Sequence, residues 1–490
     1  MRISLISPKW DKMVLTYPPL GLAYVAAMLE RKGHEVRIHV FSLDPTSPLA
    51  NDVDEVCQFS PDVVGISSMT NVYFSAMQTA RLVKEKIGCP VIIGGPHASV
   101  LPERTVQEPD VDFVVFGEGE EAMVELVEAI ETGDSLDNIR GLCFKKRGEV
   151  VKNQPRALLD NLDALPFPAR HLLQLDRFPL RAQNGDMMVT VITSRGCPYD
   201  CSYCFKGLFG RTYRRRSCEN VIAELKTIVD TYGIKNFYFI DDLFTTDVKW
   251  LTRFVDSLVA ENLPVRWQCL ARVDRVSPAL LEQMYLAGCR EIHYGVESGN
   301  QSILQGVNKG ISLATVRQAI SWTKQAGIMT KGYFMVGLPG DTEETIRQTI
   351  EFALDLDLDD AMFSVTTPFP GTRLWQELSR RRPQVEFDQN FARAYYFNVN
   401  SDNVGVFLNV SEISDKKLLD LARLAVKTIS DQQIKRRYKS TFGALLGPVF
   451  WQLARIGVFR AIGKRLPILG SRRRSLRSRV QLERQWSCEQ

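Results

Sequence analysis

The stretch Ser194-Arg-Gly-Cys-Pro-Tyr-Asp-Cys-Ser-Tyr-Cys-Phe205 decides the fold and the chemistry of this chain. It sets Cys197, Cys201 and Cys204 in the pattern Cys-x-x-x-Cys-x-x-Cys, directly after an apolar segment that predicts a strand. Three thiolates at this spacing can hold one face of a four-iron cluster and leave the fourth iron open. The alternative is a structural zinc site, but such sites close on four ligands, and only Cys218 follows nearby.

The loop with the three cysteines follows the first of six strand candidates, which are separated by helical stretches. The candidates are Met188–Thr193, Asn236–Asp241, Val265–Ala271, Glu291–Glu297, Thr330–Val336 and Ala361–Thr367. Six consecutive βα units curl into a parallel TIM-type barrel or partial (βα)6 barrel, with chemistry at the carboxyl ends of the strands. After Thr372 the pattern becomes helical and irregular, and it predicts a helix over Leu418–Ile429.

Before residue 135, a second alternation predicts a doubly wound, Rossmann-like sheet. The expected strands are Ile3–Ile6, Glu35–Phe41, Val63–Ser67, Val91–Ile93 and Phe113–Phe116, and the expected helices are Gly21–Lys32, Tyr73–Lys86 and Glu120–Glu131. Such a sheet binds ligands at the carboxyl ends of its strands. No Gly-x-Gly-x-x-Gly follows the first strand, so a nicotinamide or flavin domain is not favoured.

These patterns predict an α/β chain in four parts. We expect the Rossmann-like domain over 1–135, a linker over 136–185, the partial barrel over 186–385 and a helical region with a basic tail over 386–490. The linker contains a hairpin-like stretch and the Pro-rich segment Leu165–Arg170.

Composition excludes several other classes of protein. With 45% hydrophobic and 24% charged residues, the chain is neither disordered nor a disulfide-rich mini-scaffold. Outside the cluster near residue 200, six of the ten cysteines are scattered singly, and the first residues contain no signal-peptide core. These features predict a reducing, cytoplasmic location.

The charge is distributed unevenly along the chain. The whole chain has a net charge of +4, but the segment from Lys435 onward contains 14 basic and only 2 acidic residues. Phe442–Phe459 is apolar, but the uncharged part is too short to span a bilayer and contains Pro448. This tail predicts either an interfacial helix on an anionic membrane surface or a helix packed on the barrel. Nucleic-acid binding is not favoured, because the arginine run lacks interleaved aromatic residues.

The cysteine spacing, with Tyr203 just before the third cysteine, resembles the radical S-adenosylmethionine (radical SAM) superfamily over about residues 185–385. In that family, S-adenosylmethionine chelates the open iron, and one electron cleaves it to methionine and a 5′-deoxyadenosyl radical. The resemblance implies that Cys197, Cys201 and Cys204 ligate a [4Fe-4S] cluster and that Tyr203 lies near the adenine.

The resemblance extends to later strand ends. It implies that Asp241 and Asp242 contact the methionine amino group, that Arg272 and Glu297 contact its carboxylate and the ribose, and that Gly337 belongs to an adenine-contacting turn. The two aspartates stand where Gly-Gly-Glu is more common. The alternatives are a buried Glu–Arg ion pair for Arg272 and Glu297, and an ordinary strand-to-helix loop, capped by Asp341 and Thr342, for the turn.

Radical SAM enzymes with a preceding Rossmann-like domain are often cobalamin-dependent. Ser67-Ser-Met69 and Gly94-Gly95 resemble the Ser-x-Leu and Gly-Gly elements of the cobalamin-binding pattern. The Asp-x-His-x-x-Gly element is replaced by Thr16-Tyr-Pro-Pro-Leu-Gly21, which keeps Gly21 and has Pro18 in the histidine position. The resemblance thus implies base-off cobalamin without a histidine ligand. His97 is either an unusual ligand or a loop histidine satisfied by the backbone.

The resemblance implies a cobalamin-dependent radical SAM methyltransferase that acts on an unactivated carbon, or on phosphorus, of a small-molecule or lipid natural-product intermediate. A flavodoxin or ferredoxin would donate electrons. The alternatives are a non-methylating cyclisation, rearrangement or oxidation, and a non-catalytic cobalamin or cluster sensor. Methylthiolation is not favoured, because Cys57 and Cys89 have no third partner at suitable spacing. Phe369, Tyr395 and Tyr396 either line a substrate pocket or belong to the core.

Overall fold

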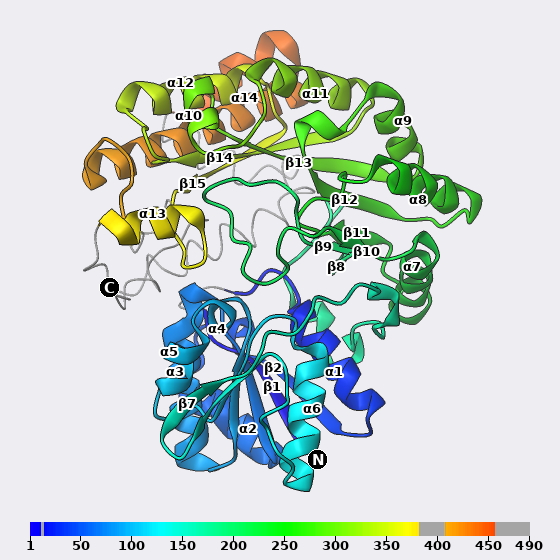
Figure 1. Ribbon diagram of the computed structural model, residues 1–490. Helices are drawn as coiled ribbons and strands as arrows, with labels where there is room; N and C mark the ends of the chain where they lie inside the picture. Colours follow the sequence, from blue (N-terminus) through cyan, green and yellow to red (C-terminus); the bar gives the residue numbers. More distant parts are fainter. Residues whose placement is uncertain (11–13, 382–405, 407, 456–490) are drawn as a thin grey trace.

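The computed structural model describes residues 1–10, 14–381, 406 and 408–455. Two α/β parts lie one above the other, with the cysteine-bearing loop between them (Figure 1). Contacts from residues after β5 to residues after β8 join the two parts, so the carboxyl ends of both sheets face the same interdomain region.

The N-terminal part is a seven-stranded sheet in the order β2-β1-β3-β4-β5-β6-β7. Its parallel strands are β1 (Arg2–Ser7), β2 (Glu35–Val40), β3 (Val63–Ser67), β4 (Val91–Gly94) and β5 (Phe113–Val115). The helices are α1 (Leu20–Arg31), α2 (Leu49–Phe59), α3 (Tyr73–Lys86), the short α4 (Pro96–Val100) and α5 (Pro102–Gln107), and α6 (Gly119–Thr132). Alternate side chains of β1 bury in two separate cores, one under α1 and α6 and one under α2 and α3. The predicted doubly wound sheet is confirmed.

The hairpin-like stretch of the predicted linker is part of this sheet, which corrects that expectation. The strands β6 (Leu142–Lys146) and β7 (Glu149–Lys152) pair antiparallel, and β6 pairs antiparallel with β5. Leu142, Cys143 and Phe144 are buried, so β6 covers what would otherwise be an open sheet edge. Short turns then follow: η3 (Leu162–Ala164), η4 (Arg170–Leu172) and η5 (Leu175–Arg177). The other domain limits stay predictions.

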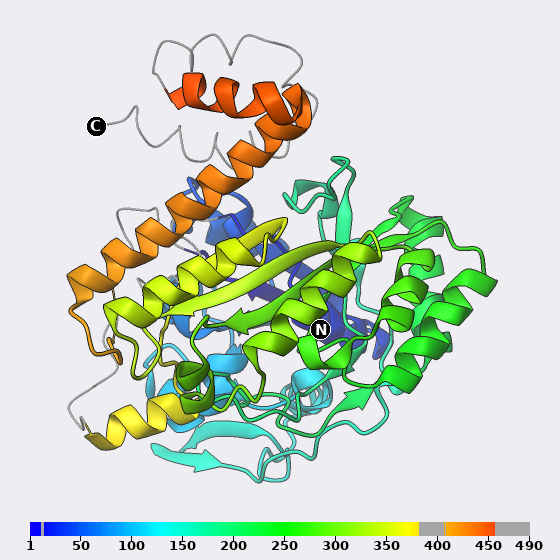
Figure 2. The same ribbon diagram turned by 90° about the horizontal axis from the view of Figure 1, so that it is seen from above.

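The second part is a six-stranded parallel sheet in the order β15-β14-β13-β12-β11-β8, which confirms the partial barrel. Its strands are β8 (Met188–Val191), β11 (Asn236–Phe239), β12 (Arg266–Ala271), β13 (Cys289–Glu297), β14 (Met329–Val336) and β15 (Asp360–Val365). Around them lie α7 (Cys218–Tyr232), α8 (Val248–Ala260), α9 (Pro278–Leu286), α10 (Gln301–Gly306), α11 (Leu313–Gln325) and α12 (Glu343–Asp355) (Figure 2). A small ribbon of β9 (Ser194–Arg195) and β10 (Arg214–Arg215) brackets the cysteine loop.

The helical C-terminal region contains α13 (Arg373–Arg381) and α14 (Asp415–Arg455), and α14 is kinked at Gly443, where φ is 80°. The helix predicted over Leu418–Ile429 is the first part of α14. Its buried residues, among them Leu418 and Leu421, join the core of the barrel. No helix among the described residues is long and apolar enough to cross a membrane. Tyr395, Tyr396 and the tail after Arg455 lie outside the described residues.

Candidate active site

The cysteine loop leaves the carboxyl end of β8 and returns through β10. Cys197, Cys201 and Cys204 are unpaired and half-buried in it. Gly196 precedes the first cysteine with φ +84°, and a Cβ there would lie 2.3 Å from the carbonyl oxygen of Thr212. Only glycine allows the two arms of the loop to approach this closely. The loop geometry therefore depends on Gly196.

The donor set fits an iron–sulfur cluster. Among the described residues, no three His, Cys, Asp or Glu side chains converge on a single metal ion. A cluster does not require such convergence, because each thiolate binds its own iron. Cys218, the possible fourth zinc ligand, is buried on α7, and its thiol points to the carbonyl of Trp250. The arrangement therefore does not support a closed zinc site.

The local charges suit a thiolate site. Burial raises the pKa of Cys204 to about 11, so this thiol stays protonated until a metal displaces the proton. Lys206 lies beside Cys204 and Cys197, and their attraction outweighs its burial and raises the pKa of its ammonium group. A positive charge is thus held next to the thiolates.

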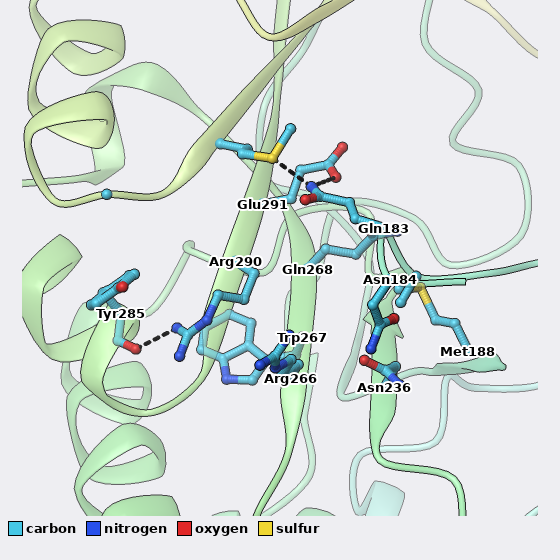
Figure 3. Close-up of a pocket in the computed structure, with 13 residues that line it drawn as sticks. Gln183, Asn184, Met188, Asn236, Arg266, Trp267, Gln268, Tyr285, Arg290 and Glu291 are labelled. Atoms are coloured by element: carbon cyan, nitrogen blue, oxygen red, sulfur yellow. Dashed lines mark hydrogen bonds between the residues drawn. The ribbon is translucent and has the colours of Figure 1, made fainter. Parts of the chain in front are cut away.

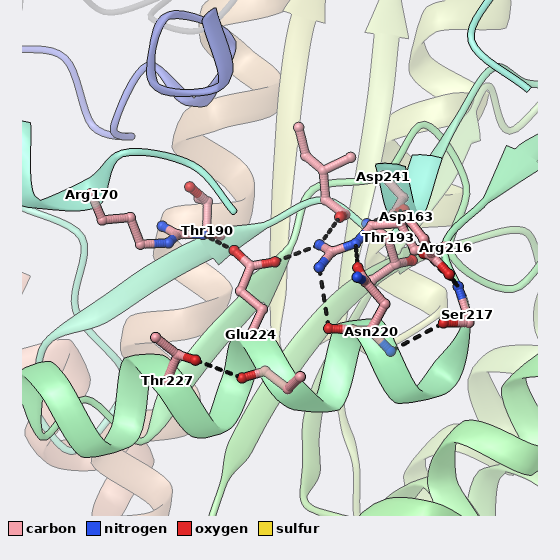
Figure 4. Close-up of polar contacts among 12 residues, drawn as sticks. Asp163, Arg170, Thr190, Thr193, Arg216, Ser217, Asn220, Glu224, Thr227 and Asp241 are labelled. Atoms are coloured by element: carbon pink, nitrogen blue, oxygen red, sulfur yellow. Dashed lines mark hydrogen bonds and ion pairs between the residues drawn. The ribbon is translucent and has the colours of Figure 1, made fainter. Parts of the chain in front are cut away.

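Asp241 links the end of β11 to the end of β8 (Figure 4). Its Oδ1 accepts hydrogen bonds from the Thr193 backbone N–H (2.9 Å) and hydroxyl (2.8 Å) and from the Ser194 hydroxyl (2.6 Å). Its Oδ2 is buried without a partner. Burial raises the pKa of Asp241 to about 6 despite these hydrogen bonds. One carboxylate oxygen therefore remains available to a ligand, while Asp242 lies exposed near Lys206.

Arg272, which follows β12, contacts the cysteine loop through the Tyr199 ring. Its guanidinium carbon lies 3.7 Å from the centre of the Tyr199 ring, inside the loop. The same group donates to both carboxylate oxygens of Asp274 and, over 2.9 Å, to the carbonyl of Lys309. The ion pair considered from sequence therefore exists, but its acid is Asp274 and not a glutamate.

Glu297 ends β13 with φ +71°, next to a shift in strand register. Its Oε1 accepts from the Lys309 ammonium group at 2.7 Å, and that ammonium group also reaches the Tyr203 hydroxyl at 3.3 Å. All three side chains lie largely out of solvent. Sequence reasoning missed Lys309, because no motif marks it and only the fold brings it beside Tyr203.

Gly337 forms the turn after β14 with φ +83°. The backbone N–H groups of Gly337 and Leu338 both donate to Asp341 Oδ2 at 2.9 Å, and Thr342 caps α12. Leu338 packs in a small apolar cluster with Tyr203. The structure thus places this turn beside the cysteine loop, together with Glu297 and Lys309.

A second polar cluster, which the sequence analysis did not identify, lies inside the barrel. His293 Nε2 lies 2.8 Å from Glu291 Oε1, and Nδ1 lies 3.1 and 3.0 Å from the hydroxyls of Tyr238 and Tyr333. The carboxylate holds the proton on Nε2, so Nδ1 accepts from a tyrosine. Burial raises the pKa of both tyrosines well above the usual value, which keeps their hydroxyls protonated.

Figure 3 shows the side chains that line a cavity of about 210 Å³. The cavity lies at the amino ends of the barrel strands, whereas the cysteine loop leaves the carboxyl end of β8. The residues that line the cavity include Met188, Asn236, Glu291 and Met329. Gln183 reaches over it and donates to Glu291 Oε2 at 3.1 Å. This cavity is therefore separate from the cysteine loop, although Glu291 connects it to His293.

The two predicted turns of the N-terminal sheet are side by side. The Ser68 N–H donates to the carbonyl of Gly94 at 2.8 Å. Gly95 has φ +92°, and a Cβ there would lie 2.9 Å from the carbonyl oxygen of Ser68. Only glycine fits this contact. Ser67 and Met69 flank it, and Met69 is 40% exposed at the carboxyl edge of the sheet.

The segment that replaces the histidine motif lies at the same edge. Pro18 is buried, and Gly21 is exposed with free space where a Cβ would lie. The centres of the Tyr17 and Tyr238 rings are 5.8 Å apart. His97 is buried, with Nδ1 3.2 Å from the Thr70 hydroxyl. Burial lowers the pKa of His97 to about 3. This environment favours the structural interpretation of His97 over a ligand role.

Comparison with known proteins identifies both parts. The family model of the B12 binding domain matches residues 11–127, and that of the radical SAM superfamily matches residues 191–353. An uncharacterised methyltransferase of Pyrococcus horikoshii is 36% identical over 384 residues, which is 77% of this chain and 83% of the relative. The chain therefore belongs to the radical SAM enzymes that carry a B12-binding domain.

Other relatives and solved structures agree with this family. The hopanoid C-3 methylase of Methylococcus capsulatus is 26% identical, over 78% of this chain and 73% of its own. The anaerobic magnesium-protoporphyrin IX monomethyl ester cyclase of Rubrivivax gelatinosus is 28% identical, over 79% and 72%. The methyltransferase TsrM from Kitasatospora setae superimposes with a TM-score of 0.67, at 20% identity and 79% coverage of both chains, and shares the fold.

Proposed function

We propose that this radical SAM enzyme is a cobalamin-dependent methyltransferase acting on an unactivated carbon, or on phosphorus, of a small-molecule or lipid intermediate. The observation that carries the proposal is the shared interdomain region. The cysteine loop and the Gly94-Gly95 turn both lie at carboxyl ends of sheets that face each other. A methylase of hopanoids and a methyltransferase of a phosphonate are among the relatives, at 26% and 27% identity.

The residues present fit the cofactors of such an enzyme. Cys197, Cys201 and Cys204 would hold a [4Fe-4S] cluster, and the Ser67–Met69 and Gly94-Gly95 turns, with Pro18 and Gly21, would hold cobalamin. When bound, the cluster with S-adenosylmethionine would supply a 5′-deoxyadenosyl radical, and cobalamin would supply the methyl group. Since no histidine stands at Pro18 and His97 is enclosed, we propose base-off cobalamin.

The side chains around the loop would bind and orient S-adenosylmethionine. The free Oδ2 of Asp241 and the carboxylate of Asp242 are acceptors suited to the methionine amino group. Glu297 is an acceptor suited to the ribose hydroxyls, and Lys309 holds it in place over 2.7 Å. Arg272 binds Asp274 and contacts the Tyr199 ring, so we propose that it stabilises the cysteine loop. We also propose that it contacts the methionine carboxylate. The Gly337 turn would border the adenine.

We propose that the substrate enters the barrel interior near His293. Along β12, Gln268 and Leu270 face the interior and are half-buried, whereas the alternate residues Cys269 and Ala271 are buried. This alternation indicates open space inside the barrel. The protonated tyrosines beside His293 would donate hydrogen bonds to an oxygen atom of the substrate. Their task is positional, because accurate placement of the reacting carbon contributes much of the rate.

Cys201→Ala tests the proposed function. It removes one of three cluster ligands, and we expect 5′-deoxyadenosine formation under anaerobic reduction, by dithionite or by a flavodoxin or ferredoxin system, to fall to background. The matched control is Cys218→Ala, which changes a buried cysteine outside the loop and should retain the activity. Liquid chromatography with mass detection measures the nucleoside. Undiminished 5′-deoxyadenosine from the Cys201 variant would refute the radical SAM assignment of these cysteines.

Non-methylating chemistry is the second candidate, favoured by the cyclase among the relatives. Product mass separates the two. Methyl transfer adds the mass of one CH₂ unit per turnover, whereas cyclisation, rearrangement or oxidation does not. A cofactor-binding sensor would form no 5′-deoxyadenosine with any substrate.

A further inference from the structure

Two carboxylates of the N-terminal domain are buried against the cysteine-bearing ribbon of the barrel. Glu118 follows β5, and its side chain is only 2% exposed. It accepts from Arg195 at 2.7 Å and from Arg214 at 2.8 Å. Glu120 accepts from the other terminal nitrogen of Arg195. The side chains of Arg195 and Arg214 are 5% and 4% exposed, so these ion pairs are shielded from solvent. Removing one partner would leave an uncompensated charge in a buried position.

On the barrel side, these contacts end at the cysteine loop. Arg195 and Arg214 are opposite each other in the β9–β10 ribbon. Gly196, whose position next to Thr212 admits no side chain, is the only residue between Arg195 and Cys197. A displacement of Arg195 is therefore passed to the first cysteine with little room for relaxation.

On the N-terminal side, the contacts lead to the glycine turn. Gly117, the residue before Glu118, donates its N–H to the Ser99 hydroxyl oxygen at 3.0 Å. That hydroxyl donates to the carbonyl of Gly95 at 2.9 Å. Hydrogen bonds and short backbone links thus join the Gly94-Gly95 turn, through Ser99, Gly117 and Glu118, to the cysteine loop.

We propose that Glu118 is a positioning residue and that Ser99, Gly117, Glu118, Arg195 and Arg214 form an interdomain strut. The strut sets the separation between the cluster bound at the cysteine loop and the cobalamin bound at the Gly94-Gly95 turn. Its function is to hold the distance between the two cofactors constant, so that the substrate can bind between them. This inference rests on the proposed function, since both cofactors must bind for their separation to matter.

The linker adds a second, independent support on the barrel side of the strut (Figure 4). Arg170 donates to Glu224 at 2.8 Å and to the carbonyl of Thr190 in β8 at 2.7 Å. Arg216, just after β10, also binds Glu224. Glu224 is buried and holds both arginines on α7. The ribbon is therefore also attached on its barrel side. Loss of Glu118 should weaken only its attachment to the N-terminal domain, where the Glu120–Arg195 pair remains.

The test uses the reconstituted holoenzyme, reduced so that the cluster and cobalamin are both paramagnetic. Pulsed electron paramagnetic resonance measures the dipolar coupling, and hence the distance, between them. We expect one narrow distance in the wild type. Glu118→Gln, which keeps the shape but removes the charge, should retain both cofactors and give a broadened distance distribution. Ser99→Ala, which alters no buried charge, should broaden it as well.

The control is Glu121→Gln. Glu121 lies in the first turn of α6, three residues after Glu118, is 43% exposed and pairs with Arg156 at 3.0 Å. This variant should give the wild-type distance. The strut is overturned if Glu118→Gln or, should that variant not fold, Ser99→Ala binds both cofactors with an unchanged distance distribution. A wild type that fails to bind either cofactor would instead overturn the proposed function, and the strut with it.

Discussion

At the scale of single residues, Asp241 is a buried carboxylate whose hydrogen bonding is incomplete. Its buried Oδ2 has no partner, although Oδ1 accepts three hydrogen bonds. A carboxylate without a full set of partners is costly to bury. A ligand that donates a hydrogen bond to Oδ2 would offset this cost. The same residue was expected near the methionine amino group.

We predict a stability gain from Asp241→Asn. The folded-state pKa of about 6 exceeds the ordinary value of 3.8, so the native state binds more protons between these values. Stability therefore falls as pH rises from about 4 to 6, and the loss is complete above that range. The amide carries no charge, and we expect Asp241→Asn to gain on the order of 1–3 kcal/mol at pH 7. It should also weaken binding of S-adenosylmethionine.

Thermal unfolding of the unloaded protein at pH 4.5 and pH 7.5 measures this effect. The gain should be present at the higher pH and small at the lower one, where Asp241 is largely protonated. Equal unfolding temperatures for both proteins at pH 7.5 would contradict the account of Asp241.

At the scale of elements, the sequence was most informative where spacing is local. The three cysteines, the Ser67–Met69 and Gly94-Gly95 pair, and the six barrel strands follow from patterns within short segments. Lys309 could not be found this way, because its contacts with Glu297 and Tyr203 come from different elements. The cluster around His293 was missed for the same reason. The hairpin β6–β7 was assigned to a linker, because its pairing with β5 depends on the tertiary fold.

We predict that the first part of α14 is needed for barrel stability. Leu421 is 2% exposed and lies in the barrel core. Leu421→Ala should lower the free energy of unfolding by roughly 2–5 kcal/mol, because it leaves a cavity in that core. Leu424→Ala is the matched control, since Leu424 is 37% exposed on the same helix. Chemical denaturation of both variants measures the difference, and a loss for Leu421→Ala no larger than that for Leu424→Ala would contradict the prediction.

At the scale of the whole molecule, two α/β parts meet at their carboxyl edges, and buried charges join them. Glu118 and Arg195 contribute contacts across this boundary that a flexible tether between independent domains would lack. The arrangement places the cysteine loop and the Gly94-Gly95 turn at the same boundary between the two parts. The chain from Lys435 onward is strongly basic, and the role of this charge is open to a direct test.

One of the two interpretations of the basic tail, an interfacial helix on an anionic membrane surface, predicts binding to anionic vesicles. Removing the residues after Ser440 deletes most of the positive charge that follows Lys435. We expect this truncation to abolish co-sedimentation with vesicles rich in phosphatidylserine, because electrostatic attraction to anionic headgroups is lost. Neutral phosphatidylcholine vesicles are the control. Unchanged binding of the truncated protein to anionic vesicles would rule out the tail as the membrane contact.

The most direct test of the central claim, that one interdomain region serves two cofactors, is an anaerobic reconstitution with iron and sulfide followed by a cobalamin titration. Absorption spectroscopy follows both steps. We predict a brown protein with a [4Fe-4S] spectrum that binds cobalamin and shifts it to the base-off form. A protein that takes up the cluster but leaves cobalamin free would contradict the account, because methyl transfer would then have no carrier.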